Sequence, residues 1–442
     1  MINRNIIKAS NPLRPARPVW WMHPSAIVCV FLIPAYLLLW WAGVATNGEI
    51  STAKSLFFLK GNIALLGLTG LLALGLGTFS PIRPSPARVI TTRNFVGPNL
   101  LATLGVLALI GYAYWFKDLL LHPATLLAAL KNSGSVTYAL RSSMERSAGI
   151  ASLAQLGLPF LVLYAHALWA GGKPVLTKLH RWLLIGILLS IVFRVFAWGE
   201  RLALVEAAVA IGFVWVSFGE LRRPWMRRLM PWLPLIGVVA VVLLFAVGEY
   251  FRSWASHYAA TRTTFWGFIL QRLTNYYFTA LNTGAGMLTM YEWPKYTMET
   301  TLLWVHKLPV FGPMFSYLMH LRPSSYMQLY GDAEFNNPSG VFPIFADLGI
   351  AGTLTLMLLL GALAKYVYST WRDSATIGGT MYFLFLMTFM ELFRYFYLGS
   401  PRCFMVVLGF TLAILNSVKV NYEHSNPAQI SGGLGSGDRL TA

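Results

Sequence analysis

Residues 248–254 read GEYFRSW and residues 330–340 read YGDAEFNNPSG. These two stretches open and close residues 249–342, the one long polar passage between apolar segments. On both sides of it the apolar runs extend over about 20 residues, the length that an α-helix needs to cross the hydrocarbon core of a bilayer. We therefore place the passage outside the membrane and look for the function where it meets the helix ends.

The composition excludes an ordinary soluble protein. Of the 442 residues, 56% are hydrophobic and 11% are charged, whereas soluble domains carry roughly a quarter charged residues. The continuous runs also differ from the alternating pattern of a membrane β-barrel. The sequence predicts an all-α polytopic membrane protein with about ten transmembrane helices and a large periplasmic loop containing short amphipathic helices. The predicted spans are residues 27–46, 56–77, 100–116, 149–168, 182–198, 202–218, 232–247, 341–363, 381–396 and 404–418.

The chain has a net charge of +18, and the positions of its basic residues indicate its orientation in the membrane. In a soluble protein such a charge would suggest a nucleic-acid partner, but here most basic residues lie in short loops between apolar runs, where the positive-inside rule explains them. We expect no nucleic-acid partner and both termini in the cytoplasm. The predicted segments are a cytoplasmic tail (1–24), transmembrane helices 1 to 7 (25–248), the periplasmic loop (249–342), transmembrane helices 8 to 10 (343–418) and a disordered cytoplasmic tail (419–442).

Two arginines lie away from the cytoplasmic loops, in the stretch FRVFAWGERLALVEA. Arg194 falls near the outer end of one predicted span and Arg201 opens the next. A charge within the membrane is costly and usually points into a bundle interior or a wet cavity, and the guanidinium fork suits phosphate oxygens. We interpret both as diphosphate ligands. Alternatively, Arg201 pairs with Glu200 or Glu206 and fixes helix packing, while Arg194 reaches the membrane surface.

A second charged cluster follows the seventh predicted span. Glu249 and Arg252 lie three residues apart, so an ion pair on one helical turn explains them. The functional interpretation makes Arg252 a phosphate or sugar ligand and Glu249 a candidate general base, which must reach a sugar hydroxyl within hydrogen-bond distance. Glu391 and Arg394 are open to the same two interpretations, a structural ion pair or part of the site.

The end of the polar passage supplies candidates for binding a glycan. Asp332, Asn336 and Asn337 lie in YGDAEFNNPSG, and such residues suit a carbohydrate-binding loop as well as an ordinary turn. Asp347 lies about two turns into the next apolar span, where an unpaired carboxylate is expensive. We take Asp347 as a second candidate for the catalytic base, with pairing to an arginine such as Arg394 as the alternative.

The sequence lacks the short signatures of several other chemistries. It contains no Walker-type or GxGxxG loop, no HExxH pair and only two cysteines, Cys29 and Cys403, so the usual nucleotide and metal motifs are missing. We expect no metal and no cofactor. The energy for a reaction would then reside in the substrate, as in a sugar attached to a lipid diphosphate.

These features resemble the Wzy-type oligosaccharide repeat-unit polymerases of bacterial envelopes, which are integral-membrane glycosyltransferases of the C type. Besides the multispan body and the large outer loop, three stretches carry the resemblance. They are ERLALVEA (200–207), EYFRS (249–253) and FNNPSGVFPIFADLGIAGTLTLMLLLG (335–361).

The resemblance implies an inverting, metal-independent enzyme of the bacterial inner membrane. It would transfer the growing glycan from undecaprenyl diphosphate to a new lipid-linked repeat unit at the periplasmic face, with a polysaccharide co-polymerase that regulates chain length as a possible partner. Outer arginines would hold the donor diphosphate, and these map onto Arg194, Arg201 and Arg252, with Arg394 as a weaker addition. Arg272 is left out, because the arginine-to-glycine spacing of some members does not match around it.

Two rival functions remain open at this stage. The first is an O-antigen ligase, which passes the finished glycan to another acceptor and usually places a histidine near that acceptor, here His257 or His320. The second is a flippase for lipid-linked sugars, which predicts charges along a path through both halves of the bilayer.

Overall fold

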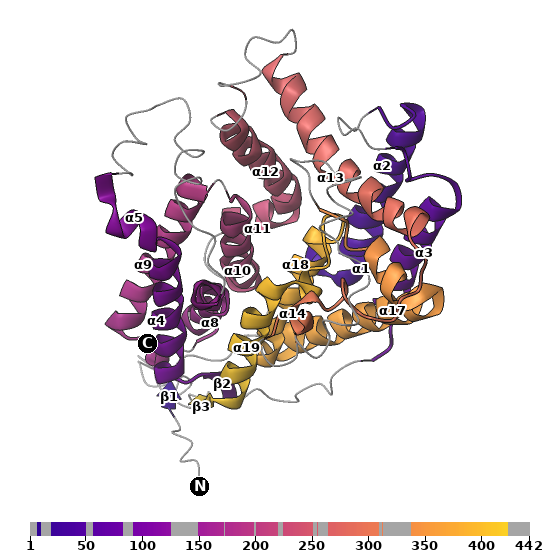
Figure 1. The fold of residues 1–442 in the computed structure, drawn as a ribbon. Coiled ribbons are helices and arrows are strands. Elements are labelled where there is room, and N and C mark those ends of the chain that lie inside the picture. Colours follow the sequence, from indigo (N-terminus) through magenta and orange to yellow (C-terminus); the bar gives the residue numbers. More distant parts are fainter. Residues whose placement is uncertain are drawn as a thin grey trace, which may run out of the picture.

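The computed structural model describes residues 7–9, 19–49, 56–82, 92–124, 149–171, 173–198, 200–219, 224–250, 254, 264–308, 312 and 337–422. In these residues the chain forms a bundle of α-helices with one small sheet (Figure 1). The elements before the polar passage are β1 Ile7–Ala9, η1 Trp20–Met22, α1 Pro24–Ala26, η2 Ile27–Leu32, α2 Ile33–Ala45, α3 Gly61–Gly77, β2 Thr92–Val96, α4 Pro98–Trp115, α5 Lys117–Leu121, η3 Ile150–Leu156, α8 Gly157–Trp169, η4 Lys173–Val175, α9 Lys178–Trp198, α10 Leu202–Gly219, α11 Pro224–Leu229, η5 Met230–Trp232 and α12 Leu233–Glu249. The later elements are α13 Phe265–Met290, α14 Leu303–His306, α17 Phe342–Ser374, η8 Gly378–Met381, α18 Tyr382–Glu391, η9 Tyr397–Gly399, α19 Pro401–Leu415 and β3 Ser417–Tyr422.

The described part of the chain contains six helices that are long and apolar enough to cross a membrane. They are Pro24–Ala45, Pro98–Trp115, Ile150–Trp169, Lys178–Ala197, Met230–Glu249 and Phe342–Ser374. Three shorter apolar helices accompany them, Gly61–Gly77, Leu202–Phe218 and Pro401–Leu415. These helices fit an all-α membrane protein in a lipid bilayer. The count of ten spans and the periplasmic position of residues 249–342 stay predictions.

Helices α3 and α17 pack against each other through glycines. A Cβ atom on Gly77 would overlap the carbonyl oxygen of Leu358, and one on Gly361 would overlap the carbonyl oxygen of Leu74. Small residues at such positions let two helix backbones approach closely, which is how membrane helices gain packing contacts without a hydrophobic driving force. This contact fixes α17 against the N-terminal part of the bundle.

Helix α17 bends near its start. Gly349 has φ 68° and ψ −173° inside an otherwise helical segment, a conformation that glycine adopts without the steric cost of a Cβ. The bend separates residues 342–348, which include Asp347, from the long remainder of the helix. The bend gives this first segment its own direction, and the segment also contacts α3, because a Cβ on Gly67 would overlap the Phe342 ring.

A three-stranded sheet was not predicted from the sequence. Its strand order is β1-β3-β2, with β1 parallel and β2 antiparallel to β3. Strand β3 follows α19 directly and continues into residues 419–422, part of the segment predicted to be a disordered tail. Because α19 runs from Pro401 into this sheet, its first turn lies away from the sheet, near α18 (Figure 1).

Helix α13 is longer and more buried than the sequence predicted. Only short amphipathic helices were predicted within residues 249–342, but this helix has 26 residues. It packs against α2, α3, α12 and α17, and most residues from Phe278 to Leu288 are buried. The helix therefore belongs to the bundle and brings Arg272 toward α12.

Candidate functional site

A cavity of about 520 Å³ lies between the start of α10, the end of α12, α13, the end of α18 and the turn before α19. This volume falls within the range of about 300–1,000 Å³ for small-ligand sites. Aliphatic side chains of α10 and α12 form one part of its wall, and charged side chains form another. The charged lining residues are Glu200, Arg201, Glu249, Arg272, Glu391, Arg394 and Arg402.

Glu249, the last residue of α12, joins two of these arginines. Its Oε1 accepts a hydrogen bond from Nη2 of Arg201, and its Oε2 lies 2.7 Å from Nε of Arg272. The Glu249 side chain is buried, so guanidinium groups take the place of the water that would otherwise solvate the carboxylate. With a cation on each oxygen, Glu249 acts as a shared counter-ion that holds Arg201 and Arg272 side by side.

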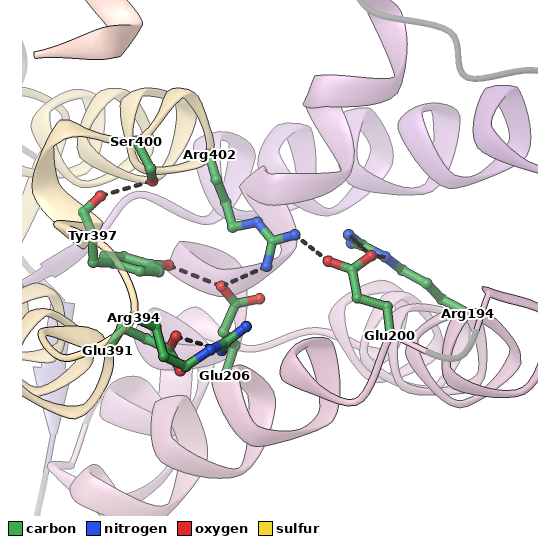
Figure 2. Close-up of polar contacts among 8 residues, drawn as sticks. All are labelled: Arg194, Glu200, Glu206, Glu391, Arg394, Tyr397, Ser400 and Arg402. Atoms are coloured by element: carbon green, nitrogen blue, oxygen red, sulfur yellow. Dashed lines mark hydrogen bonds and ion pairs between the residues drawn. The ribbon is translucent and has the colours of Figure 1, made fainter. Parts of the chain in front are cut away.

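Arg402 ties the start of α19 to α10. Its Nη2 donates to Oε1 of Glu200 and its Nη1 to Oε1 of Glu206 at 3.3 Å. The hydroxyl of Tyr397 donates to the same oxygen of Glu206 at 3.2 Å. Figure 2 shows Arg402 between these two glutamates, with Arg194 reaching Glu200 from the far side. The turn that ends at α19 is thereby fixed to α10 by charged hydrogen bonds.

Glu200 is the bridge between Arg402 and Arg194. Nε and Nη2 of Arg194 both donate to Oε2 of Glu200, at 2.9 and 2.6 Å. Burial alone would raise the pKa of the Glu200 carboxyl, but the charges and hydrogen bonds of Arg402 and Arg194 together lower that pKa to about 2. Glu200 is therefore an anion at neutral pH, and its negative charge holds both guanidiniums in place.

Arg194 lies behind the cavity wall and not in it. The residue is 1% exposed, its guanidinium carbon stacks 3.8 Å from the centre of the Trp115 ring, and it is not among the described residues that line the cavity. Its expected role as a direct diphosphate ligand therefore has no geometric support here. In the structure it positions Glu200.

Arg394 forms an ion pair with Glu391, which is the last residue of α18. Nη1 of Arg394 donates to Oε2 of Glu391 at 2.6 Å, and the guanidinium carbon lies 4.4 Å from the centre of the Tyr276 ring. The Nε of Arg394 is buried and donates to no described residue. Within the described residues only Nη1 of Arg394 donates a hydrogen bond, and the side chain is 13% exposed, so the guanidinium keeps donor capacity at the cavity after its ion pair is formed.

Arg201 also keeps donors for a ligand. Only its Nη2 donates a hydrogen bond within the described part of the chain, and its side chain is 16% exposed. Its guanidinium carbon lies over the Phe245 ring at 4.6 Å, which holds the plane of the fork. Among the described residues of the lining, four arginines against three glutamates leave a formal excess of one positive charge. An anion that fits between Arg201 and Arg394 would be the complementary ligand.

Asn337 lines the cavity as expected for a polar wall residue. The segment that carries it is fixed to the turn after α18, because the N–H of Gly340 donates to the carbonyl of Leu392 at 2.8 Å and Ser339 forms a β-bridge with Tyr395. A Cβ on Gly340 would collide with the backbone of Tyr395. The glycine of NNPSG therefore permits the close approach that places Asn337 at the site.

Asp347 lies outside the described lining of the cavity. Its Oδ2 accepts four hydrogen bonds, from the N–H and Oγ1 of Thr300 at 3.0 and 2.7 Å and from those of Thr301 at 2.6 and 2.7 Å. The expected alternative partner, Arg394, binds Glu391 instead. Asp347 is therefore an anchor for the segment that precedes α14, and its geometry does not suit a base for a ligand in the cavity.

Three predicted site residues, Arg252, Asp332 and Asn336, lie outside the described residues, as do His257 and His320. The structure brings together Arg201, Glu249, Arg394 and Asn337 from the predicted set. It adds Arg272 and Arg402, which were not predicted as site residues, and it places in the lining Glu391, for which an ion pair and a role in the site were both open. Each is a charged residue in or beside an apolar helix. From the sequence alone, such a residue can be expected to have a buried partner or to face a cavity, but the two cases look the same.

Comparisons with models of known protein families, with curated proteins and with solved structures found no match to this chain. Within the described ranges, no three His, Cys, Asp or Glu side chains come together as metal ligands would.

Proposed function

We propose that the protein is a glycosyltransferase of the repeat-unit polymerase type, acting on undecaprenyl-diphosphate-linked oligosaccharides. The observation that supports this most is that Arg201 and Arg394 line the same cavity and that each keeps guanidinium donors that are not used by its glutamate partner. A diphosphate leaving group develops negative charge as its bond to the sugar breaks, and fixed donors aimed at that charge lower the barrier. The apolar wall from α10 and α12 suits the prenyl chain of the same substrate.

The aromatic residues of the cavity suit the sugar part. Tyr276, Tyr277 and Tyr395 line it together with Asn337. Tyrosine rings offer an apolar face and a hydroxyl, and an asparagine amide both donates and accepts hydrogen bonds, which is the mixture that a sugar ring presents. We assign this side of the cavity to the reacting sugars and the arginine side to the diphosphate.

The proposed function implies a location. The cavity lies at the start of α19, and the sheet that includes the N-terminal strand lies at the other end of this helix. With both termini in the cytoplasm of a bacterium and the protein in its inner membrane, the start of α19 and the cavity would lie toward the periplasm. The proposed topology is tested by fusing a reporter that is active only in the cytoplasm to each terminus in turn. Both fusions should be active.

The function is tested with the purified full-length protein in liposomes supplied with an undecaprenyl-diphosphate-linked repeat unit. We expect a ladder of longer glycans that remain attached to the lipid. Transfer to a lipid A core or protein acceptor without lengthening would support the ligase instead. Movement of the lipid-linked sugar across the membrane with no new glycosidic bond would support the flippase.

Gly248 offers a way to move Arg201 without removing it. A Cβ on Gly248 would overlap the Nε of Arg201, and a flexible side chain can yield to such a clash at small cost. We expect Gly248→Ala to leave the protein folded and to lower the elongation rate about 10-fold or more, since small misplacements of a positioning group carry large kinetic costs. The matched control is Gly237→Ala on the same helix, where a Cβ would meet no atom within 4 Å. Equal rates for the two variants would contradict the role of Arg201.

A further inference from the structure

The three glutamates among the described residues that line the cavity differ in how many of their carboxylate oxygens accept a hydrogen bond or face a cation. Glu200 binds Arg402 through Oε1 and Arg194 through Oε2. Glu249 faces Arg201 with Oε1 and Arg272 with Oε2. Glu391 binds Arg394 through Oε2, and its Oε1 accepts no hydrogen bond from the described residues. Among these three, Glu391 is the carboxylate with an oxygen left for a ligand.

This difference matters because the transfer needs a proton acceptor. A general base must present a free lone pair to the hydroxyl that attacks, within hydrogen-bond reach. A carboxylate with a guanidinium on each oxygen has its lone pairs committed to structure. The Glu249 carboxylate, which the sequence suggested as the base, is in that condition.

The position of Glu391 gives the helix no electrostatic benefit. It is the last residue of α18, and its backbone carbonyl accepts from the N–H groups of Arg394 and Tyr395 at 2.8 and 2.9 Å. The C-terminal end of a helix carries partial negative charge, so a carboxylate is disfavoured there. A buried acid at this point, 6% exposed as a residue, is better explained by the cavity that it lines.

We propose that Glu391 is the general base of the transfer, an inference that rests on the proposed function. The acceptor hydroxyl donates its proton to Oε1 of Glu391 while its oxygen forms a bond to the anomeric carbon of the donor sugar. The bond from that carbon to the diphosphate oxygen breaks on the opposite face, and the electron pair leaves with undecaprenyl diphosphate. Arg394 holds Oε2 of Glu391 in place, and Arg201 contacts the departing diphosphate.

The test uses Glu391→Gln in the full-length protein in liposomes with an undecaprenyl-diphosphate-linked repeat unit. Glutamine keeps the shape of the side chain but cannot take up the proton. We expect kcat for elongation to fall by about 100- to 10,000-fold, with the KM for the lipid-linked substrate within a few-fold of wild type. The matched control is Glu292→Gln, whose side chain is 99% exposed and which should elongate at the wild-type rate.

The outcomes separate the two proposals. Elongation by wild type together with a Glu391→Gln kcat within about threefold of wild type overturns the base and leaves the function standing. No elongation by wild type overturns the function and this inference with it. If Glu391→Gln fails to reach the membrane, Glu391→Asp decides instead. Aspartate keeps the charge but draws the oxygen back by one methylene, so kcat should fall about 10-fold or more, and an unchanged kcat overturns the base.

Discussion

Replacing Arg201 with alanine is expected to lower the rate of glycan elongation about 100-fold or more, while the protein remains in the membrane at the wild-type level. Arg201 contacts Glu249 through one nitrogen and keeps its other donors at the cavity. Removal of one donor to an oxyanion typically costs about 100- to 1,000-fold in rate. The measurement is the initial rate of chain lengthening in liposomes, normalised to the amount of protein.

A charge-preserving variant tests why Arg201 is needed. Lysine keeps the positive charge but lacks the planar fork that binds two phosphate oxygens at once, so Arg201→Lys should recover only part of the rate. Arg228→Ala removes an exposed arginine of α11, which lies outside the cavity lining, and should leave the rate unchanged. An Arg201→Ala rate within about threefold of wild type would remove this residue from the site.

The removal of Arg194 is expected to act differently. Its donors are taken by Glu200 and its ring partner is Trp115, so alanine would leave Glu200 with one cation less. We expect a less stable protein with slower elongation, and partial recovery of both in Arg194→Lys. The sequence could place Arg194 and Arg201 at similar depth, but it could not show which of them faces a cavity.

The helices were predictable because their signal is local. Continuous apolar runs specify helices in a membrane through the need to satisfy backbone hydrogen bonds within each segment, and helices occur at the predicted positions from α2 to α19. The sheet was missed because its strands are three to six residues long and come from distant parts of the chain. The length of α13 was missed because its second half is buried by α2, α3 and α17, and tertiary contacts override a local amphipathic pattern.

The site was predictable as a set of residue types and not as a set of pairs. Sequence spacing suggested Glu249 with Arg252, which lies outside the described residues, and it could not suggest the two partners that the structure adds, Arg201, 48 positions away, and Arg272. The pairing of Glu391 with Arg394 was found because the two lie three positions apart. Arg402 bonds to glutamates about 200 positions away, and no local pattern reports such a contact. Charges buried in apolar segments thus identified the region, and only the packing assigned the partners.

Asp347 carries the largest expected effect on stability. Its Oδ2 accepts from the N–H and hydroxyl groups of Thr300 and Thr301, and the residue is fully buried. Hydrogen bonds to a charged group contribute about 1.5–3 kcal/mol each, and donors left unsatisfied by removal of their acceptor add to the loss. We expect Asp347→Ala to lower the free energy of unfolding by about 3 kcal/mol or more. The matched control is Asp373→Ala, because Asp373 is a partly exposed carboxylate paired with its neighbour Arg372 and should cost less than about 1 kcal/mol.

The consequence of Asp347→Ala should extend to the cavity through the backbone. Thr301 packs so closely against η9 that a Cβ on Gly399 would overlap the Thr301 carbonyl, and η9 leads through Ser400 into the start of α19, which carries Arg402. Loss of the Asp347 anchor therefore loosens the segment beneath Arg402 as well as the start of α17. Unfolding midpoints of the purified protein in detergent measure the loss of stability. Elongation rates, measured under conditions well below the midpoint, measure the effect on the cavity. A midpoint for Asp347→Ala equal to that for Asp373→Ala would show that the four hydrogen bonds contribute no more than a surface ion pair.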